Sequence, residues 1–139
     1  MITRDAIVTE ARTWLGTPYR HQGRIKGIAV DCVGLVIGVC QALGIPCRDE
    51  TGYSRRPDGT LTPALTVQTL PVEGLPLPGD IAVFHWQGES VHLAIVTGED
   101  RIIHALAINR RVCEHRLDER MQRMIKMCRR IPGVGAEAK

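Results

Sequence analysis

Apolar positions in the first third of the chain predict two helices of different kinds. Between residues 4 and 15 they recur every three or four positions, which predicts an amphipathic helix capped by Thr3. Residues 32–43 are apolar on all sides, which predicts a buried helix. Asp31 is the expected N-cap of this second helix, and Gly44 the expected stop.

The pattern changes in the second half of the chain. Strand-length apolar runs follow Gly79, and the turns between them are short enough for hairpins. The predicted strands span residues 80–86, 91–98, 101–108 and 110–117. Residues 123–131 suit either a last strand or a helix, because their periodicity fits both. Before the strands, the irregular stretch 45–78 contains one short predicted helix within 61–70.

Helices that precede a hairpin-linked sheet predict an α+β fold with an antiparallel meander. We expect the sheet to cover the buried helix, so that the start of that helix lies against the first strands. The length of 139 residues fits one domain, predicted over residues 1–131, with a flexible tail over 132–139.

Composition narrows the function classes. No apolar run reaches the roughly 18 residues that a bilayer requires, and acidic residues interrupt the N-terminal apolar stripe. We therefore expect no signal peptide and no membrane insertion. The net charge is +3, and the arginines beyond residue 110 are interspersed with acidic residues. This pattern is typical of a solvated surface, and we expect no nucleic-acid partner.

The five cysteines form an odd set without a CxxC pair, which argues against a disulfide framework or a zinc ribbon. Cys32 falls on the first turn of the predicted buried helix. The helix dipole and unpaired N–H groups there favour a thiolate, so we expect a lowered pKa. Cys40 and Cys47 are expected to be structural.

Two histidines fall on adjacent predicted strands. The turn near residue 99 places about position 105 opposite His92, and a neighbouring register brings His104 beside it. With Cys32 they suit a nucleophile, a base and a group that orients the base. The same three residues also suit a zinc site with three protein ligands, and that alternative stays open. His85 and His115 are expected on the strand surface.

Four short motifs carry a family resemblance. "DCVGL", "LPGDIAVF", "HLAIVTG" and "IIHA" occur in this order. Their order and spacing resemble the NlpC/P60 family of papain-like cysteine peptidases over about residues 3–131. Within that family the chain is most similar to phage and prophage cell-wall peptidases and tail-assembly proteins.

The resemblance implies a papain-like fold and assigns roles to individual residues. Cys32 matches the family nucleophile, His92 the base and His104 the third, polar member. Tyr19 matches a tyrosine whose hydroxyl lines the oxyanion site, and Asp31 matches a residue that caps the helix and supports the site. No metal or organic cofactor is implied.

Two departures fall near the expected substrate cleft. Val33 stands where the family often has serine, and "YRHQGR" replaces the family pattern Y-x-W-G-G. We expect His21, Arg24 and Lys26 to contact substrate, with the two cations contacting acidic groups of a peptidoglycan stem peptide.

The implied function is that of a cysteine endopeptidase acting on stem peptides of the bacterial cell wall. The resemblance further implies carriage in a phage virion, on the tail tip, with other tail-tip proteins as partners. The alternative is a structural tail-tip or tail-assembly component that has this fold and little hydrolytic activity.

Overall fold

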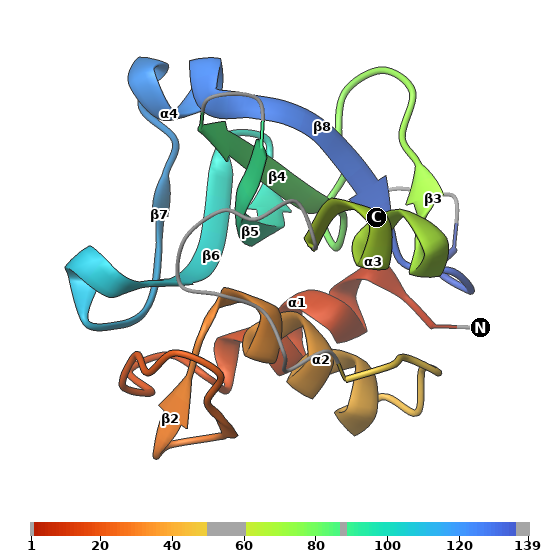
Figure 1. The fold of residues 1–139 in the computed structure, drawn as a ribbon. Coiled ribbons are helices and arrows are strands. Elements are labelled where there is room, and N and C mark those ends of the chain that lie inside the picture. The colour runs from red at the N-terminus through yellow and green to blue at the C-terminus, as the bar shows by residue number, and fades with distance from the viewer. Residues whose placement is uncertain (1, 50–60, 87–88, 136–139) are drawn as a thin grey trace.

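The computed structural model describes residues 2–49, 61–86 and 89–135, and it has the predicted α+β architecture (Figure 1). The N-terminal part contains α1 (Arg4–Arg12), β1 (Arg24–Ile25), β2 (Ala29–Val30), α2 (Cys32–Ala42) and α3 (Leu61–Gln68). The remainder contains β3 (Leu70–Pro71), β4 (Ile81–Trp86), β5 (Glu89–Gly98), β6 (Arg101–Leu106), the short 3-10 helix η1 (Ala107–Asn109), β7 (Arg111–Arg116), α4 (Glu119–Met124) and β8 (Ile125–Arg130). None of the helices in these described ranges is long and apolar enough to cross a membrane.

Helix α1 begins as predicted but ends earlier. The Thr3 hydroxyl accepts the N–H of Ala6 at 3.0 Å, which satisfies one free donor of the first turn. The helix stops at Arg12 and a turn follows, so Leu15 leaves the buried stripe and is 45% exposed. Trp14 stays buried, as expected.

Helix α2 begins at the predicted residue, ends one residue before the predicted end and lies in the core. Asp31 accepts the N–H of Gly34 at 2.8 Å, and Gly44 adopts the left-handed φ of +71° that ends the helix. A Cβ added at Gly38 would lie 2.1 Å from the Trp14 ring. The absence of a side chain at Gly38 therefore lets Trp14, in the turn after α1, pack closely on α2.

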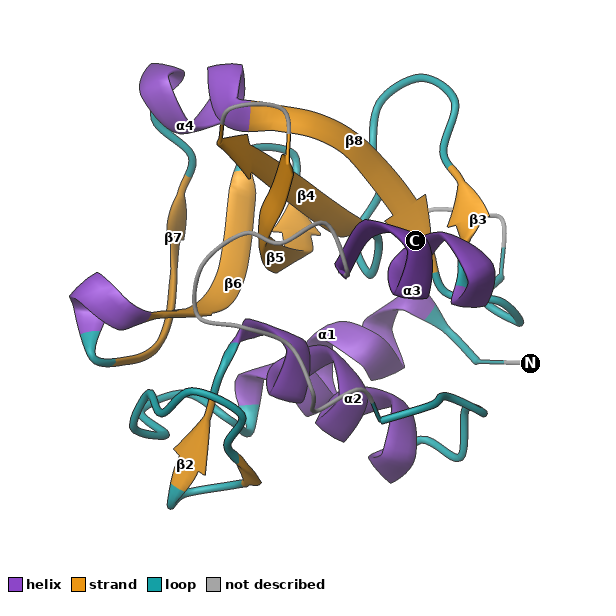
Figure 2. Cartoon of the chain, in the orientation of Figure 1, coloured by secondary structure: helices purple, strands orange, loops and turns teal. Residues whose placement is uncertain are grey.

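The six-stranded sheet has the order β3-β8-β4-β5-β6-β7 (Figure 2). Strands β4 to β7 form the predicted meander. The ambiguous run 123–131 is mostly strand: β8 pairs with β4, and α4 precedes it. The β5–β6 hairpin pairs Ile95 with Ile103, shifted by one position from the predicted alignment. Extended along both strands, this register puts His92 and His104 on the same face.

Apolar residues pack on both faces of the sheet. The main core lies between the sheet and the pair α1 and α2, as Figure 1 shows. A smaller cluster that includes Phe84, Val96 and Ile102 lies on the opposite face, and Met121 and Met124 of α4 pack against it. The face that carries His92 and His104 is therefore covered at α4 and bounded by β7.

The predicted tail over residues 132–139 lies only partly within the described residues. Ile2 and Val134 form a bridge between parallel segments, and the N–H of Gly135 donates to the Ile2 carbonyl at 3.0 Å. Residues 132–135 are thus held against the N-terminal segment, and the tail expected beyond them falls on residues 136–139, outside the described residues. The turn predicted between the strands at 80–86 and 91–98 includes residues 87 and 88, which lie outside the described residues.

Candidate active site

Cys32 is the first residue of α2, which packs against β5 and β6. The residue is partly exposed, and the N–H groups of Leu93, Val33 and Cys32 itself lie within hydrogen-bonding reach of its thiol. Because Leu93 follows His92, the sulfur lies near the backbone of β5 at the residue after the expected base.

The thiol does not have the expected lowered pKa. Burial raises the pKa of Cys32 to about 12, and the negative charge of Asp31 acts in the same direction. The three backbone N–H groups act in the opposite direction, but their effect is smaller. Desolvation therefore outweighs the helix N-terminus, and the resting nucleophile is a neutral thiol.

His92 and His104 are hydrogen-bonded to each other, with His92 Nε2 and His104 Nδ1 at 2.8 Å. Both rings are buried, with His104 fully so. Burial lowers the pKa of His92 to about 3 and that of His104 to about 4, and each is lowered further by the next histidine along. Both imidazoles are consequently neutral near pH 7.

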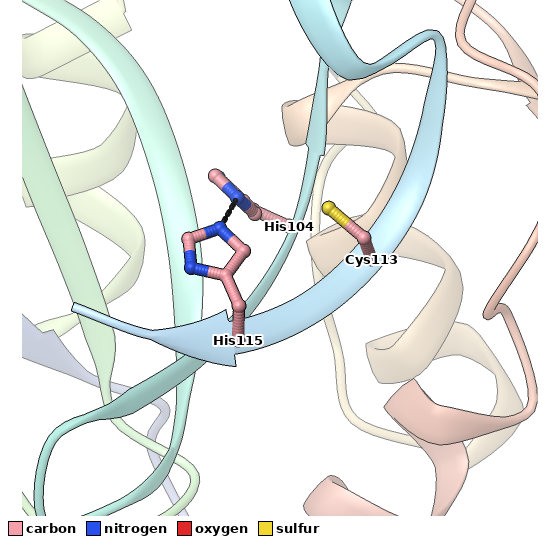
Figure 3. Close-up of side chains that lie close together, drawn as sticks. All are labelled: His104, Cys113 and His115. Atoms are coloured by element: carbon pink, nitrogen blue, oxygen red, sulfur yellow. Dashed lines mark hydrogen bonds between the residues drawn. The ribbon is translucent and has the colours of Figure 1, made fainter. Parts of the chain in front are cut away.

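His115 extends this pair, although the sequence indicated only a surface position. Its Nε2 lies 2.8 Å from His104 Nε2, as Figure 3 shows for the two rings. Its Nδ1 lies 2.7 Å from the carbonyl oxygen of Arg116. The β6–β7 register explains the contact: His104 pairs with Cys113, and His115 is two residues further on the same face. The connection between β6 and β7 is short and limits their register, so it is the feature of the sequence that could have indicated this contact.

The Arg116 carbonyl, at the end of the series of hydrogen-bonded histidines, determines which ring nitrogens carry a proton. A carbonyl only accepts, so a neutral His115 carries its proton on Nδ1 and accepts at Nε2. His104 then donates from Nε2 and accepts at Nδ1, and His92 donates from Nε2. The ring nitrogen of His92 left to accept a proton is Nδ1. The hydrogen bonds thus assign the tautomer that a base needs.

Asp31 does more than cap α2. It is 2% exposed, and its second oxygen accepts the N–H of Gln22 at 2.7 Å. Arg24 donates to Asp31 at 3.0 Å and to Asp49 at 2.8 Å. The structure therefore places Arg24 as an ion-pair partner of Asp31, the residue before Cys32. A contact of Arg24 with substrate stays a prediction.

The other expected site residues lie on the segment that leads into α2. The N–H of Tyr19 donates to the Arg110 carbonyl at 2.8 Å, and Tyr19 pairs with the strand residue just before Asp31. Lys26 forms an ion pair with Glu10 at 2.8 Å. His21 is partly exposed on the same segment. Their roles toward substrate stay predictions.

An apolar cavity of about 70 Å³ lies beside the site, between α2, α3 and the sheet. Its lining includes Val33 and Leu93, the residues that follow Cys32 and His92. The few polar groups at its wall include Arg48 and Gln68. The site is therefore next to a space that suits a small apolar side chain.

The alternative zinc set predicted from Cys32, His92 and His104 differs from the one the structure forms. In the described ranges, the histidine, cysteine and acidic side chains that converge as metal ligands are His104, Cys113 and His115. Cys32 and His92 are not part of this group.

The ion pair of Arg24 has a measurable consequence. Arg24→Ala is expected to lower the free energy of unfolding by about 1–2 kcal/mol, because it leaves the buried Asp31 carboxylate with one charged partner fewer. Lys26→Ala removes an exposed pair and is expected to cost at most about 0.5 kcal/mol. Urea unfolding measures both. Equal losses would contradict the supporting role of Arg24, and the substrate roles are tested separately by KM.

Comparison with known proteins relates this geometry to a family. The family model described as NlpC/P60 family matches residues 16–130. A probable endopeptidase of Corynebacterium glutamicum is 32% identical over 118 residues, which cover 84% of this chain and 49% of the relative. The chain thus spans about half the length of the curated relatives it matches.

Solved structures agree on the fold. The NlpC/p60 domain of the peptidoglycan hydrolase SagA has a TM-score of 0.67 at 24% identity, covering 94% of this chain and 100% of that one. An NlpC/P60 family protein from Bacillus cereus has a TM-score of 0.74 at 22% identity, covering 92% of this chain and 40% of that one. At these identities the likeness establishes the papain-like fold that the resemblance implied.

Proposed function

The chain belongs to the NlpC/P60 family, and from this premise we propose that it is a cysteine-type endopeptidase that cleaves peptide bonds in peptidoglycan stem peptides. One observation carries the chemistry: α2, which begins at Cys32, packs against β5 and β6, the strands that carry the hydrogen-bonded pair of His92 and His104, and the tautomer of His92 is set for proton acceptance. The names of the relatives, a probable endopeptidase and a peptidoglycan hydrolase, support the substrate class.

The Cys32 thiol and the His92 imidazole are both neutral at rest, and this determines how the reaction starts. As Cys32 Sγ attacks the scissile carbonyl, its proton moves to His92 Nδ1, and the new S–C bond forms a tetrahedral intermediate. His104 accepts from His92 Nε2 and stabilises the imidazolium. The Cys32 N–H and the Tyr19 hydroxyl are the proposed donors to the oxyanion.

Collapse of the intermediate breaks the C–N bond. His92 returns the proton to the leaving amine, which departs and leaves an acyl group on Cys32. A water molecule then attacks the acyl carbon, with His92 taking its proton, and hydrolysis releases the acid and restores the thiol. The proton balance closes without a metal or cofactor.

The decisive experiment is the digestion of purified sacculi. Released fragments are identified by mass spectrometry, with heat-inactivated protein as the blank. New amino and carboxyl termini within stem peptides support the proposal and identify the bond. Fragments cut only in the glycan, or no release at all, would contradict it.

We also propose, on the resemblance of the sequence to phage and prophage proteins, that the chain acts on a phage tail tip. Its partners would then be other tail-tip proteins, and its location the virion. Detection of the chain in purified particles, with labelling at the tail tip, tests this. Particles without the chain would contradict it. Particles that contain it, with no wall hydrolysis, would favour the structural role.

His115 is expected to act as a positioning residue through His104. His115→Ala should lower kcat about 10-fold with KM unchanged, because the tautomer of His92 is no longer determined by the Arg116 carbonyl. In a His104→Ala background the same change should have little further effect, since the connection is already broken. Additive losses would contradict a role through His104 and indicate a merely structural one.

A further inference from the structure

We propose that His104, Cys113 and His115 form a binding site for Zn²⁺ at the end of the histidine chain remote from Cys32. We further infer that zinc there prevents His92 from acting as a base. The second statement rests on the proposed peptidase function, whereas the first does not.

The register of β6 and β7 brings the three side chains together. His104 pairs directly with Cys113, and His115 follows Cys113 by two positions, so all three lie on one face. One ligand atom from each lies within 4.8 Å of the others. Figure 3 shows the Cys113 thiol directed toward the space beside the two imidazoles.

The donor set suits zinc. Two imidazoles and a thiolate form a typical three-ligand set, and a water molecule completes the tetrahedron. With Zn–N near 2.0 Å and Zn–S near 2.3 Å, the ligand atoms must lie roughly 3.3–3.6 Å apart. His104 Nε2 and His115 Nε2, now 2.8 Å apart, must therefore separate slightly, and the thiol must approach.

The surroundings permit this adjustment. His104 is fully buried, but Cys113 and His115 are partly exposed, so a cation reaches the site from their side and their side chains have room to turn. The Asn109 amide donates to Cys113 Sγ at 3.1 Å. A hydrogen bond of this kind stabilises a metal-bound thiolate from outside the ligand set.

Zinc at this site would reverse the direction of the hydrogen bond between His104 and His92. Coordination uses the lone pair of His104 Nε2, so the proton on that atom must be carried on Nδ1 instead. His104 then donates to His92 Nε2, and His92 carries its own single proton on Nδ1. Each imidazole keeps one proton, and the thiol proton of Cys113 leaves to solvent. His92 now has no lone pair for the Cys32 proton.

Binding is tested without any activity measurement. Calorimetry with ZnCl₂ on the Cys32→Ala protein, which lacks the catalytic thiol, should show one zinc per chain. Cys32→Ala/Cys113→Ser should bind at least about 10-fold more weakly, as should Cys32→Ala/His115→Gln. Cys32→Ala/Cys128→Ser is the matched control and should bind like the parent. No stoichiometric binding, or equal affinity with and without Cys113, would overturn the site.

Cobalt provides a second, spectroscopic measurement. Co²⁺ added to the Cys32→Ala protein should produce a thiolate-to-metal absorption band, and Cys113→Ser should remove it while Cys128→Ser leaves it. A band that survives Cys113→Ser would overturn the assignment of the ligand. Circular dichroism of each variant confirms that it is folded.

The switch is tested by hydrolysis of sacculi. Zn²⁺ should inhibit the unmodified protein, and Cys113→Ser should keep its basal rate while needing at least about 10-fold more zinc. Equal inhibition of both would overturn the switch, even where calorimetry supports the site. Absence of hydrolysis without zinc would instead contradict the proposed function and overturn the switch that rests on it, and calorimetry would still decide the site.

Discussion

Cys32→Ala is expected to lower kcat/KM for peptide release from sacculi by at least about 10³-fold. Alanine removes the atom that forms the acyl intermediate, and the remaining N–H groups and histidines have no covalent route. The fold should be kept, because the change removes a single sulfur atom from the first residue of α2 and leaves the Asp31 cap of this helix in place. Quantified release of muropeptides measures the loss.

Cys128→Ala is the matched control for this loss. It removes a partly exposed thiol on β8 that is not among the residues lining the cavity beside the site. Activity should stay within about 2-fold of the unmodified protein, since surface-type changes away from a site have small effects. Substantial activity in Cys32→Ala would show that hydrolysis does not use this nucleophile. A comparable loss in both variants would indicate a general effect on the fold.

Local chemistry in the sequence was sufficient to predict both N-terminal helices. Thr3 and Asp31 accept N–H groups of the first turns, as their residue types indicate. The bounds of α2 follow from Asp31 and Gly44, because both ends of this helix are set by its own neighbours in the chain. The helix near 61–70 was also predicted.

Nonlocal pairing explains what the sequence left open. Residues 123–131 fit the periodicity of a helix and that of a strand. Most of this run forms strand β8, because it pairs there with the otherwise open edge of β4. The short strands β1, β2 and β3 were not predicted, since two residues carry no periodicity. Leu15 was expected in the core, yet the turn after Arg12 rotates it outward.

The same distinction applies to the candidate site. The proximity of His92 and His104 follows from a hairpin, so the sequence alone predicts it. The raised pKa of Cys32 does not, because it depends on how completely the tertiary structure desolvates the sulfur. The ion pairs of Arg24 with Asp31 and Asp49 likewise join segments that only the fold brings together.

Asp80→Asn is expected to lower the free energy of unfolding by about 3–5 kcal/mol. The Asp80 carboxylate is fully buried, and it accepts hydrogen bonds from Arg4 at 3.1 Å, from Arg130 at 2.9 Å and from the Leu77 N–H at 2.8 Å. It thereby ties the start of α1 and the end of β8 to the start of β4. An amide keeps the size but leaves the buried Arg4 cation without a counter-charge.

Asp100→Asn is the matched control, because it makes the same substitution in an exposed pair with Arg116. This change should cost at most about 1 kcal/mol. Urea unfolding of both variants and the parent gives the comparison. Losses of equal size would show that burial of the Asp80 network does not determine its contribution.

The pH dependence of stability distinguishes the contribution of the Asp80 charge from that of the packing of its side chain. Burial alone would raise the pKa of Asp80, but the hydrogen bonds from Arg130, Leu77 and Arg4 together lower it below its ordinary value of 3.8. A carboxyl with a lowered pKa stabilises the fold above its unfolded pKa, and the contribution disappears as the pH falls through the folded value. The stability difference between the parent and Asp80→Asn should therefore be constant near neutral pH and shrink below about pH 4. A difference that stays unchanged into acid would mean that packing of the side chain, and not its charge, stabilises this junction.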